Sequence, residues 1–296
     1  MIPRPLGVNT WVWSSPLTDE NLPGLARRIA DLGFDAIELP LENSGDLDHA
    51  ETAAVLRETG LAPYVVGAMA PGRDLVTASP VAVTGTQAYL RECIDLAAAV
   101  GSPAVCGPFY AQTGRVWRMS SEQRQATYAE WRENLAPVAD HAVERGVVLG
   151  IEPLNRYETS LVNTVDQALT GLGPLLGQGV GLALDTYHLN IEERDSAAAI
   201  RTAGEHLVHL QVCGNDRGAP GHDQTDWVAI VAALDEIGYS GALNIESFTP
   251  DNAAIAVAAS IWRPLADSPD ALASDGLAFL RSLTAESPPR GPETDL

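Results

Sequence analysis

Cysteine is scarce in this chain, and its few thiols lie far apart. The 296 residues include 3 cysteines, Cys93, Cys106 and Cys213, and none of them forms a Cys-x-x-Cys pair. An odd number of widely spaced cysteines argues against a disulfide framework, and a four-cysteine zinc site needs one ligand more than the chain contains. The thiols favour a reducing compartment, and we expect the protein in the cytoplasm.

Long apolar runs are lacking as well. No stretch reaches the roughly 18 apolar residues that a membrane-spanning helix needs. The opening residues 1–5 are not followed by the apolar core and small-residue cleavage site of a signal peptide. We therefore expect no membrane partner.

Basic residues are few, since 18 Lys and Arg stand against 39 Asp and Glu, for a formal net charge of −21. A surface this acidic repels phosphate backbones, which argues against a nucleic-acid partner. We interpret most of the carboxylates as surface groups that keep the protein soluble. Some of them, however, must belong to a functional site.

The sequence does contain a regular alternation of short β-rich runs and amphipathic segments, in units of about 30 residues. The predicted strands are Gly7–Trp13, Asp35–Leu39, Leu61–Val66, Pro103–Cys106, Val147–Glu152, Gly181–Asp185, Leu207–Val212 and Ala242–Glu246. The predicted helices between and after them are Asp19–Leu32, Asp48–Glu58, Thr86–Val100, Ser121–Arg145, Thr164–Leu176, Ser196–Ala203, Asp226–Ile237, Ala253–Trp262 and Ala271–Leu283.

Strands that alternate with helices pair in parallel through right-handed crossovers. We predict a single α/β domain over residues 1–285, a (β/α)8 TIM barrel with an extra C-terminal helix. A doubly wound sheet would show a glycine-rich phosphate turn after the first strand, and residues 9–13 (NTWVW) are not one. Residues 286–296 are rich in proline and charge and are predicted to be a flexible tail.

Polar residues end the last four predicted strands: Glu152, Asp185, Gln211 and Glu246. In a β/α barrel these ends form the active-site face. Carboxylates that share one mouth repel each other unless a cation neutralises them, and oxygen ligands suit Mn(II), Mg(II) or Co(II). The pattern predicts a divalent-metal site. The alternative is that these carboxylates cap helices or face water.

Four motifs carry a resemblance to a known family. They are IEPLNRYE at 151–158, LDTYHLNIEE at 184–193, NDRGAPG at 215–221 and NIESF at 244–248. They resemble the ketose 3-epimerases, the D-tagatose/D-psicose 3-epimerase group of the xylose-isomerase-like barrel superfamily. Isomerases, epimerases, dehydratases and C-glycoside-cleaving relatives share these motifs, so they are more specific for the superfamily than for one reaction.

The resemblance implies a role for each matching residue. Glu152, Asp185, Gln211 and Glu246 would hold the metal, with Mn(II) as the first choice; Glu152 and Glu246 would be the catalytic acid/base pair; Glu158, His188 and Arg217 would hold the reacting end of the sugar. Trp11 and Trp13 could stack on a sugar ring or pack in the barrel, and we name Trp13 as the candidate. Relatives are commonly dimers or tetramers, so we expect a homo-oligomer.

The chemistry explains why such residues are needed. A proton on the carbon next to a ketone is weakly acidic, and a metal on the neighbouring oxygens stabilises the enediolate that forms when it leaves. A carboxylate on one face removes the proton, and a second carboxylate on the other face returns one, which inverts that carbon.

One position departs from the family pattern. Relatives have His-x-His at the end of the seventh strand, and this chain reads His209-Leu210-Gln211. Gln211 can bind a hard metal through its amide oxygen, although more weakly than imidazole. The other interpretations are an altered or weak metal site, or His209 acting as the ligand.

Three functional hypotheses follow. The first is a metal-dependent epimerase or isomerase of unphosphorylated sugars, with 3-epimerisation favoured. The second is a lyase on a keto sugar, either a dehydratase or the catalytic subunit of a C-glycoside deglycosidase, which would need a small partner subunit. The third is an inactive sugar-binding barrel. The superfamily's DNA-repair branch is disfavoured, because it needs a histidine-rich trinuclear zinc site and a DNA-binding face, whereas this chain has 6 histidines and is strongly acidic.

Overall fold

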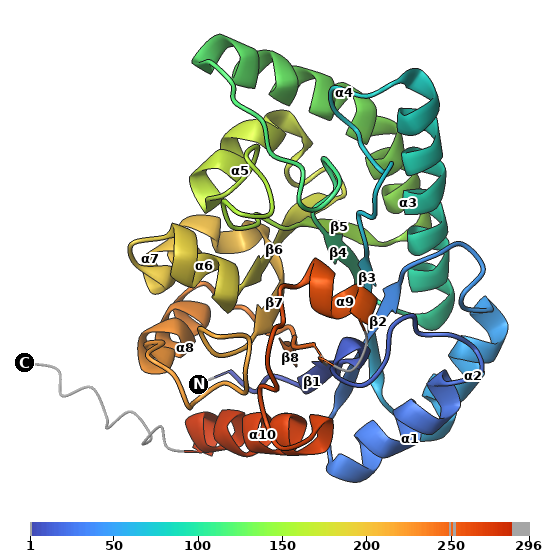
Figure 1. The fold of residues 1–296 in the computed structure, drawn as a ribbon, viewed down its shortest axis with the longest axis vertical. Coiled ribbons are helices and arrows are strands. Elements are labelled where there is room, and N and C mark those ends of the chain that lie inside the picture. Colours follow the sequence, from blue (N-terminus) through green and yellow to red (C-terminus); the bar gives the residue numbers. More distant parts are fainter. Residues whose placement is uncertain (1, 249, 251–252, 286–296) are drawn as a thin grey trace, which may run out of the picture.

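A computed structural model describes residues 2–248, 250 and 253–285, so the predicted tail 286–296 lies outside the described residues. Eight parallel strands close into a barrel in sequence order, and β1 pairs with β8 to complete the ring (Figure 1). The predicted (β/α)8 architecture is confirmed. The strands are β1 Leu6–Asn9, β2 Ala36–Leu41, β3 Ala62–Gly67, β4 Ala104–Gly107, β5 Val148–Ile151, β6 Val180–Asp185, β7 Leu207–Val212 and β8 Leu243–Ile245.

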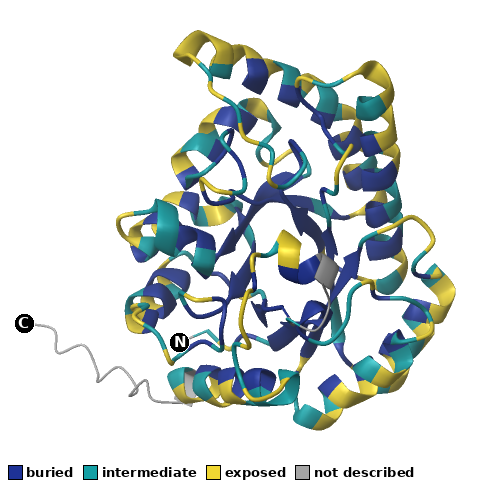
Figure 2. Cartoon of the chain, in the orientation of Figure 1, coloured by how far each residue is buried: buried dark blue, intermediate teal, exposed yellow. Residues whose placement is uncertain are grey.

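Helices surround the barrel, with exposed outer faces and buried inner faces (Figure 2). The α-helices are α1 Leu22–Leu32, α2 His49–Thr59, α3 Pro80–Val100, α4 Ser121–Arg145, α5 Val165–Leu172, α6 Thr186–Glu192, α7 Ser196–Ala203, α8 Trp227–Glu236, α9 Ala253–Ala258 and α10 Pro269–Ala285. Among the described residues, the short 3-10 helices are η1 Thr10–Val12, η2 Gly173–Leu175 and η3 Gly204–His206. Within the described part of the chain, no helix combines the length and apolarity needed to cross a membrane.

The strands are buried on both faces, and their side chains alternate between two environments. In β2, Ile37 and Leu39 join the apolar core between strands and helices. Glu38 points the other way and meets side chains of β7 inside the barrel. The barrel interior is therefore partly polar.

The first strand is shorter than predicted. It ends at Asn9, whose side-chain oxygen accepts the backbone N–H of Trp11 at 2.8 Å and begins η1. Trp11 and Trp13 therefore belong to the turn after the strand, and the prediction of a strand up to Trp13 was wrong.

Helices α3 and α6 also differ from prediction. Helix α3 begins at Pro80 instead of Thr86, because Ser79 caps it and accepts the N–H of Ala82 at 3.2 Å. Helix α6 was not predicted. It begins where the Asp185 carboxylate accepts the N–H of Tyr187 at 2.8 Å.

Helix α9 lies across the opening of the barrel in Figure 1. It ends at Ala258, earlier than the predicted Trp262. Its buried Ile255 and Ala256 belong to one apolar cluster with Trp11, Phe248 and residues of the barrel interior. This packing covers one end of the barrel with apolar side chains.

Candidate active site

Three carboxylates gather where β5, β6 and β8 end. Glu152 and Glu246 directly follow β5 and β8, and Asp185 is the last residue of β6. Their exposed fractions are 7%, 5% and 1%, respectively. The structure thus brings together the three residues that the sequence placed at the centre of the site, in a region nearly closed to water.

Arg217 supplies positive charge to this cluster. Its Nη1 contacts Asp185 Oδ2 and lies 2.8 Å from Glu246 Oε2. The turn that presents it is closed by a bond from the N–H of Gly214 to the carbonyl of Gly218 at 2.9 Å, and Arg217 has φ +67 there. Because that conformation is unfavourable for a residue with a side chain, the guanidinium is held at a local conformational cost.

The carboxylates differ in their affinity for protons. Burial, reinforced by the Asp185 charge, raises the pKa of Glu152 well above its ordinary value. Burial and the neighbouring carboxylates act on Glu246 in the same way, and its pKa is also raised well above normal despite Arg217. Burial opposes the charge of Asp185 too, but Arg217 and His188 outweigh it and lower the pKa. Two groups suited to exchanging protons therefore flank one that stays ionised.

Donors face both ring nitrogens of His188. Its Nδ1 receives the backbone N–H of Asn155 at 3.1 Å and the Asn155 side-chain amide at 3.0 Å. Its Nε2 lies 3.1 Å from Arg217 Nη2, which can only donate, and 3.5 Å from Glu152 Oε1. Burial and the Arg217 charge lower the pKa of His188. The ring therefore joins Asn155 to the cluster of Arg217 and the carboxylates.

Ligand atoms of Glu152, Asp185 and His188 lie within 4.8 Å of one another, close enough for a shared metal ion. The two carboxylates are well suited to a cation. His188 is less suited, because its Nδ1 accepts from Asn155 and its Nε2 already faces Arg217 Nη2 at 3.1 Å. Gln211 provides another donor, since its Oε1 is buried without a hydrogen-bond partner among the described residues.

The donor set therefore fits a divalent cation on structural grounds. Buried carboxylates with raised pKa values are stabilised by positive charge, and a buried amide oxygen without a partner gains a ligand. Asp185 and Gln211 are neighbours in the register of β6 and β7, and Gln211 also contacts Glu246.

The remaining predicted residues occupy different positions. Glu158 is half-buried and accepts the Asn155 side-chain amide at 2.7 Å, on the His188 side of the cluster. Trp13 donates its indole N–H to Asp270 at 2.8 Å and packs against the outer core. The contacts of Trp13 do not connect it with the carboxylates, and its substrate role stays a prediction.

The surroundings of His209, Cys106 and Cys213 favour structural roles for these residues. His209 Nε2 lies 2.5 Å from Glu38 Oε1, one layer below Gln211, as expected from strand alternation. Burial raises the pKa of the Cys106 and Cys213 thiols well above normal, so both stay protonated. Neither thiol is suited to act as a nucleophile.

Sequence reasoning did not identify Glu38 and Phe248 as part of the site. Glu38 is fully buried and contacts Gln211, and Phe248 packs against Trp11 with ring centroids 5.5 Å apart. A signal for Glu38 existed: it is the charged residue of an otherwise apolar strand, on the face opposite Ile37 and Leu39. An acid at such a position must point into the barrel.

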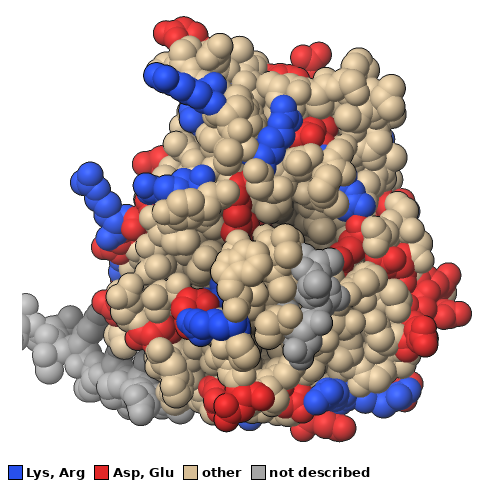
Figure 3. Space-filling model, in the orientation of Figure 1, with Lys and Arg blue, Asp and Glu red and all other residues tan. Residues whose placement is uncertain are grey.

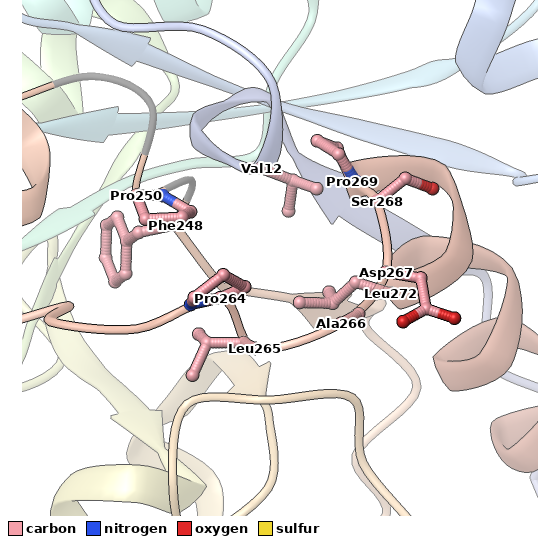
Figure 4. Close-up of a pocket in the computed structure, with 10 residues that line it drawn as sticks. All are labelled: Val12, Phe248, Pro250, Pro264, Leu265, Ala266, Asp267, Ser268, Pro269 and Leu272. Atoms are coloured by element: carbon pink, nitrogen blue, oxygen red, sulfur yellow. The ribbon is translucent and has the colours of Figure 1, made fainter.

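A small cavity of about 140 Å³ lies beside the mouth, between η1, the chain after β8 and the start of α10 (Figure 4). Its lining includes Val12, Phe248 and Leu272, but none of the three carboxylates. Figure 3 shows residues other than Lys, Arg, Asp and Glu over the middle of this face, with acidic and basic side chains around them. The carboxylate cluster, rather than this cavity, carries the groups capable of chemistry.

Comparison with known proteins agrees with the fold. Residues 26–283 match the family model described as xylose isomerase-like TIM barrel. A probable ketose 3-epimerase from Synechocystis sp. is 31% identical over 277 residues, which cover 93% of this chain and 95% of that protein. A crystal structure of D-allulose 3-epimerase from Methylomonas sp. aligns with a TM-score of 0.85 at 28% identity, covering 96% of this chain and 99% of that one. A structure of L-ribulose 3-epimerase aligns with a TM-score of 0.85 at 29% identity, covering 98% and 100%.

Proposed function

Because this chain belongs to the xylose isomerase-like TIM barrel family and its relatives include ketose 3-epimerases, we propose that it inverts the carbon next to the carbonyl of a ketose. The observation that carries the proposal is the pair Glu152 and Glu246. Both are buried beside Asp185 and both have raised pKa values. A carboxyl group with a raised pKa holds a proton more readily than an exposed one does, as an acid/base pair requires.

In the proposed mechanism, one glutamate removes the proton from the sugar carbon and the other returns a proton to the opposite face. The assignment of Glu152 or Glu246 to the first step depends on the configuration of the substrate. Asp185 stays ionised and does not take part in proton transfer.

Glu152, Asp185, Gln211 and Glu246 are the residues that would hold a divalent metal, with Mn(II) favoured over Mg(II) and Co(II). When bound, such an ion would polarise the carbonyl and offset the negative charge that develops on its oxygen. The unpartnered Gln211 Oε1 and the buried carboxylates support this assignment.

Three further residues would hold the reacting end of the sugar. Arg217 would stabilise negative charge on oxygen, and Nε2 of His188 would form a hydrogen bond with a hydroxyl of the sugar. Glu158 would accept from a hydroxyl. Trp11 and Phe248, which pack with α9, would exclude water from the reacting carbon.

Proton exchange in deuterated water tests this proposal. The full chain, supplied with Mn(II), is incubated with a panel of ketoses and 3-keto glycosides, and NMR follows deuterium at the carbon next to the carbonyl. We expect incorporation and epimer formation with at least one ketose. Glu152→Gln and Glu246→Gln should each lower the epimerisation rate by about 100-fold or more.

The matched control is Glu205→Gln, which changes an exposed glutamate of η3 in the same way and should leave the rate unchanged. Epimerisation at the wild-type rate in both site variants would refute the acid/base assignment. An elimination product with no epimer would instead identify the enzyme as a lyase.

A further inference from the structure

The amide of Gln211 is held by two carboxylates. The residue is 2% exposed, and its Nε2 donates to Glu38 Oε2 at 2.9 Å and to Glu246 Oε1 at 2.8 Å. Both amide protons are therefore used. The amide oxygen has no hydrogen-bond partner in the part of the chain that the structure describes.

Glu38 is itself fixed by other donors. It is fully buried, and it receives the side-chain amide of Asn9 at 2.5 Å and Nε2 of His209 at 2.5 Å. Asn9 cannot turn over, because its oxygen accepts the N–H of Trp11 at 2.8 Å. Side chains of β1 and β7 thus hold the Glu38 carboxylate in place, and it has little freedom to move.

These contacts favour one orientation of the Gln211 amide. If the amide turned over, both hydrogen bonds that its Nε2 donates would be lost. Its oxygen would then face Glu38 Oε2, an acceptor that the side-chain amide of Asn9 already contacts. The oxygen of Gln211 must therefore stay on the side away from Glu38.

We propose that Glu38 is a positioning residue that makes Gln211 present its oxygen to the metal, so that the metal site has an all-oxygen donor set. The inference rests on the proposed metal site. It explains how a glutamine can serve as a metal ligand, and it predicts which metal ions the site prefers. Oxygen-only sites suit hard ions such as Mn(II) and Mg(II), whereas imidazole nitrogen favours Zn(II), Ni(II) and Cu(II).

The electron spin echo of bound Mn(II) tests the donor set directly, because an imidazole nitrogen bound to the ion modulates the echo. The chain is stripped of metal by chelation and loaded with Mn(II) alone. We expect no modulation from bound imidazole in the wild type and clear modulation in Gln211→His. Imidazole modulation in the wild type would overturn the proposal, because His188 or His209 would then be a ligand.

Metal affinities test the role of Glu38. Free Mn(II) is measured by its solution EPR signal, and Zn(II) is measured by competition. Glu38→Gln frees the amide of Gln211 to turn over and should weaken Mn(II) binding by about 10-fold or more, as changes behind a metal ligand typically do. Gln211→His should raise the affinity for Zn(II) relative to Mn(II) by about 10-fold or more.

Gln211→Met serves as a second variant, because it removes the oxygen and leaves the contacts of Glu38 with Asn9 and His209 in place. It should weaken Mn(II) binding at least as much as Glu38→Gln. The control is Tyr64→Phe, which alters the barrel interior beside His209, at a ring distance of 5.2 Å, without touching Gln211. Its metal affinities should match the wild type.

The outcomes separate the two proposals. If the wild-type protein binds no Mn(II), the proposed metal site itself is refuted. Normal Mn(II) binding by the wild type together with unchanged affinity in Gln211→Met would overturn only the inference about Gln211. Loss of affinity in Gln211→Met but not in folded Glu38→Gln would leave Gln211 as a ligand and remove the role of Glu38.

Discussion

The guanidinium of Arg217 and the carboxylate of Glu246 form a buried ion pair, with Nη1 2.8 Å from Oε2 and side-chain exposures of 6% and 7%. The same Nη1 contacts Asp185. One arginine therefore neutralises acids that come from two strands, and its loss would leave buried charge without a partner.

We expect Arg217→Gln to destabilise the chelator-treated protein by about 3–5 kcal/mol, because removing one partner of a buried ion pair leaves the other uncompensated. Added Mn(II) should recover much of this loss. Urea unfolding with and without the ion measures both effects. Arg156→Gln is the control, because Arg156 is 60% exposed in its pair with Glu192. An equal loss in both variants would contradict the special role of Arg217.

Metal removal should lower the thermal midpoint of the wild-type protein. A ligand that binds only the folded state at 100 times its dissociation constant adds about 2.7 kcal/mol to the free energy of unfolding. We expect Mn(II) to restore the midpoint after chelation, as measured by differential scanning calorimetry. In Asp185→Asn the ion should have a much smaller effect, and a wild-type response there would place the ion elsewhere.

His188 should have separable structural and chemical roles. His188→Ala leaves the buried N–H of Asn155 without an acceptor, which should cost about 1–3 kcal/mol. His188→Asn can replace the Nδ1 acceptor but not the contacts of Nε2 with Arg217 and Glu152. We therefore expect recovered stability in urea, together with a rate of proton exchange that stays low. Wild-type exchange in His188→Asn would rule out a role of the ring in proton exchange.

The contact between the chain before β1 and helix α8 should make the stability of the fold depend on pH, through Asp235. Burial tends to raise its pKa, but the N–H of Ile2 and the Arg4 guanidinium outweigh burial and lower it. A carboxyl with a lowered pKa stabilises the fold above its unfolded value of about 3.9, and this contribution disappears as the pH falls through the folded-state pKa. Arg4 Nη2 lies 2.8 Å from Asp235 Oδ1 and ties the chain before β1 to α8.

Asp235→Asn should therefore destabilise the protein by about 1.5 kcal/mol at pH 7, as expected for a charged hydrogen bond, and by much less at pH 3. Denaturant midpoints at the two pH values give the difference. Glu236→Gln is the matched control, since the next residue pairs with Arg201 at the surface. A loss in Asp235→Asn that stays the same at both pH values would show that its charge is not responsible.

Strand number, order and the three carboxylates could be predicted because each depends on local pattern. An apolar run followed by an acid marks a strand end, and Glu152, Asp185 and Glu246 all follow that rule. The end of β1 could not be predicted in this way. Residues 10–13 have the β-branched and aromatic character of a strand, but the Asn9 side chain competes for the backbone and begins a turn.

The partners of Gln211 were beyond sequence reasoning for a different reason. Glu38 lies 173 residues before it, and only the closure of the barrel brings β2 and β7 side chains together. The ring of His188 likewise contacts Asn155, 33 residues away along the chain. Pairs of this kind follow from the register of the closed sheet, which no local pattern contains.

Because all three thiols are buried, the native cysteines should react slowly with thiol-specific labels. Cys93, Cys106 and Cys213 are all buried, and burial raises the pKa of Cys93 to about 12. A reporter cysteine in place of Tyr157, which is 77% exposed, would therefore take a maleimide dye alone. Cys106 belongs to the same apolar cluster as Ile255 and Ala256 of α9, so the rate of alkylation of this native thiol would report how often the cluster opens.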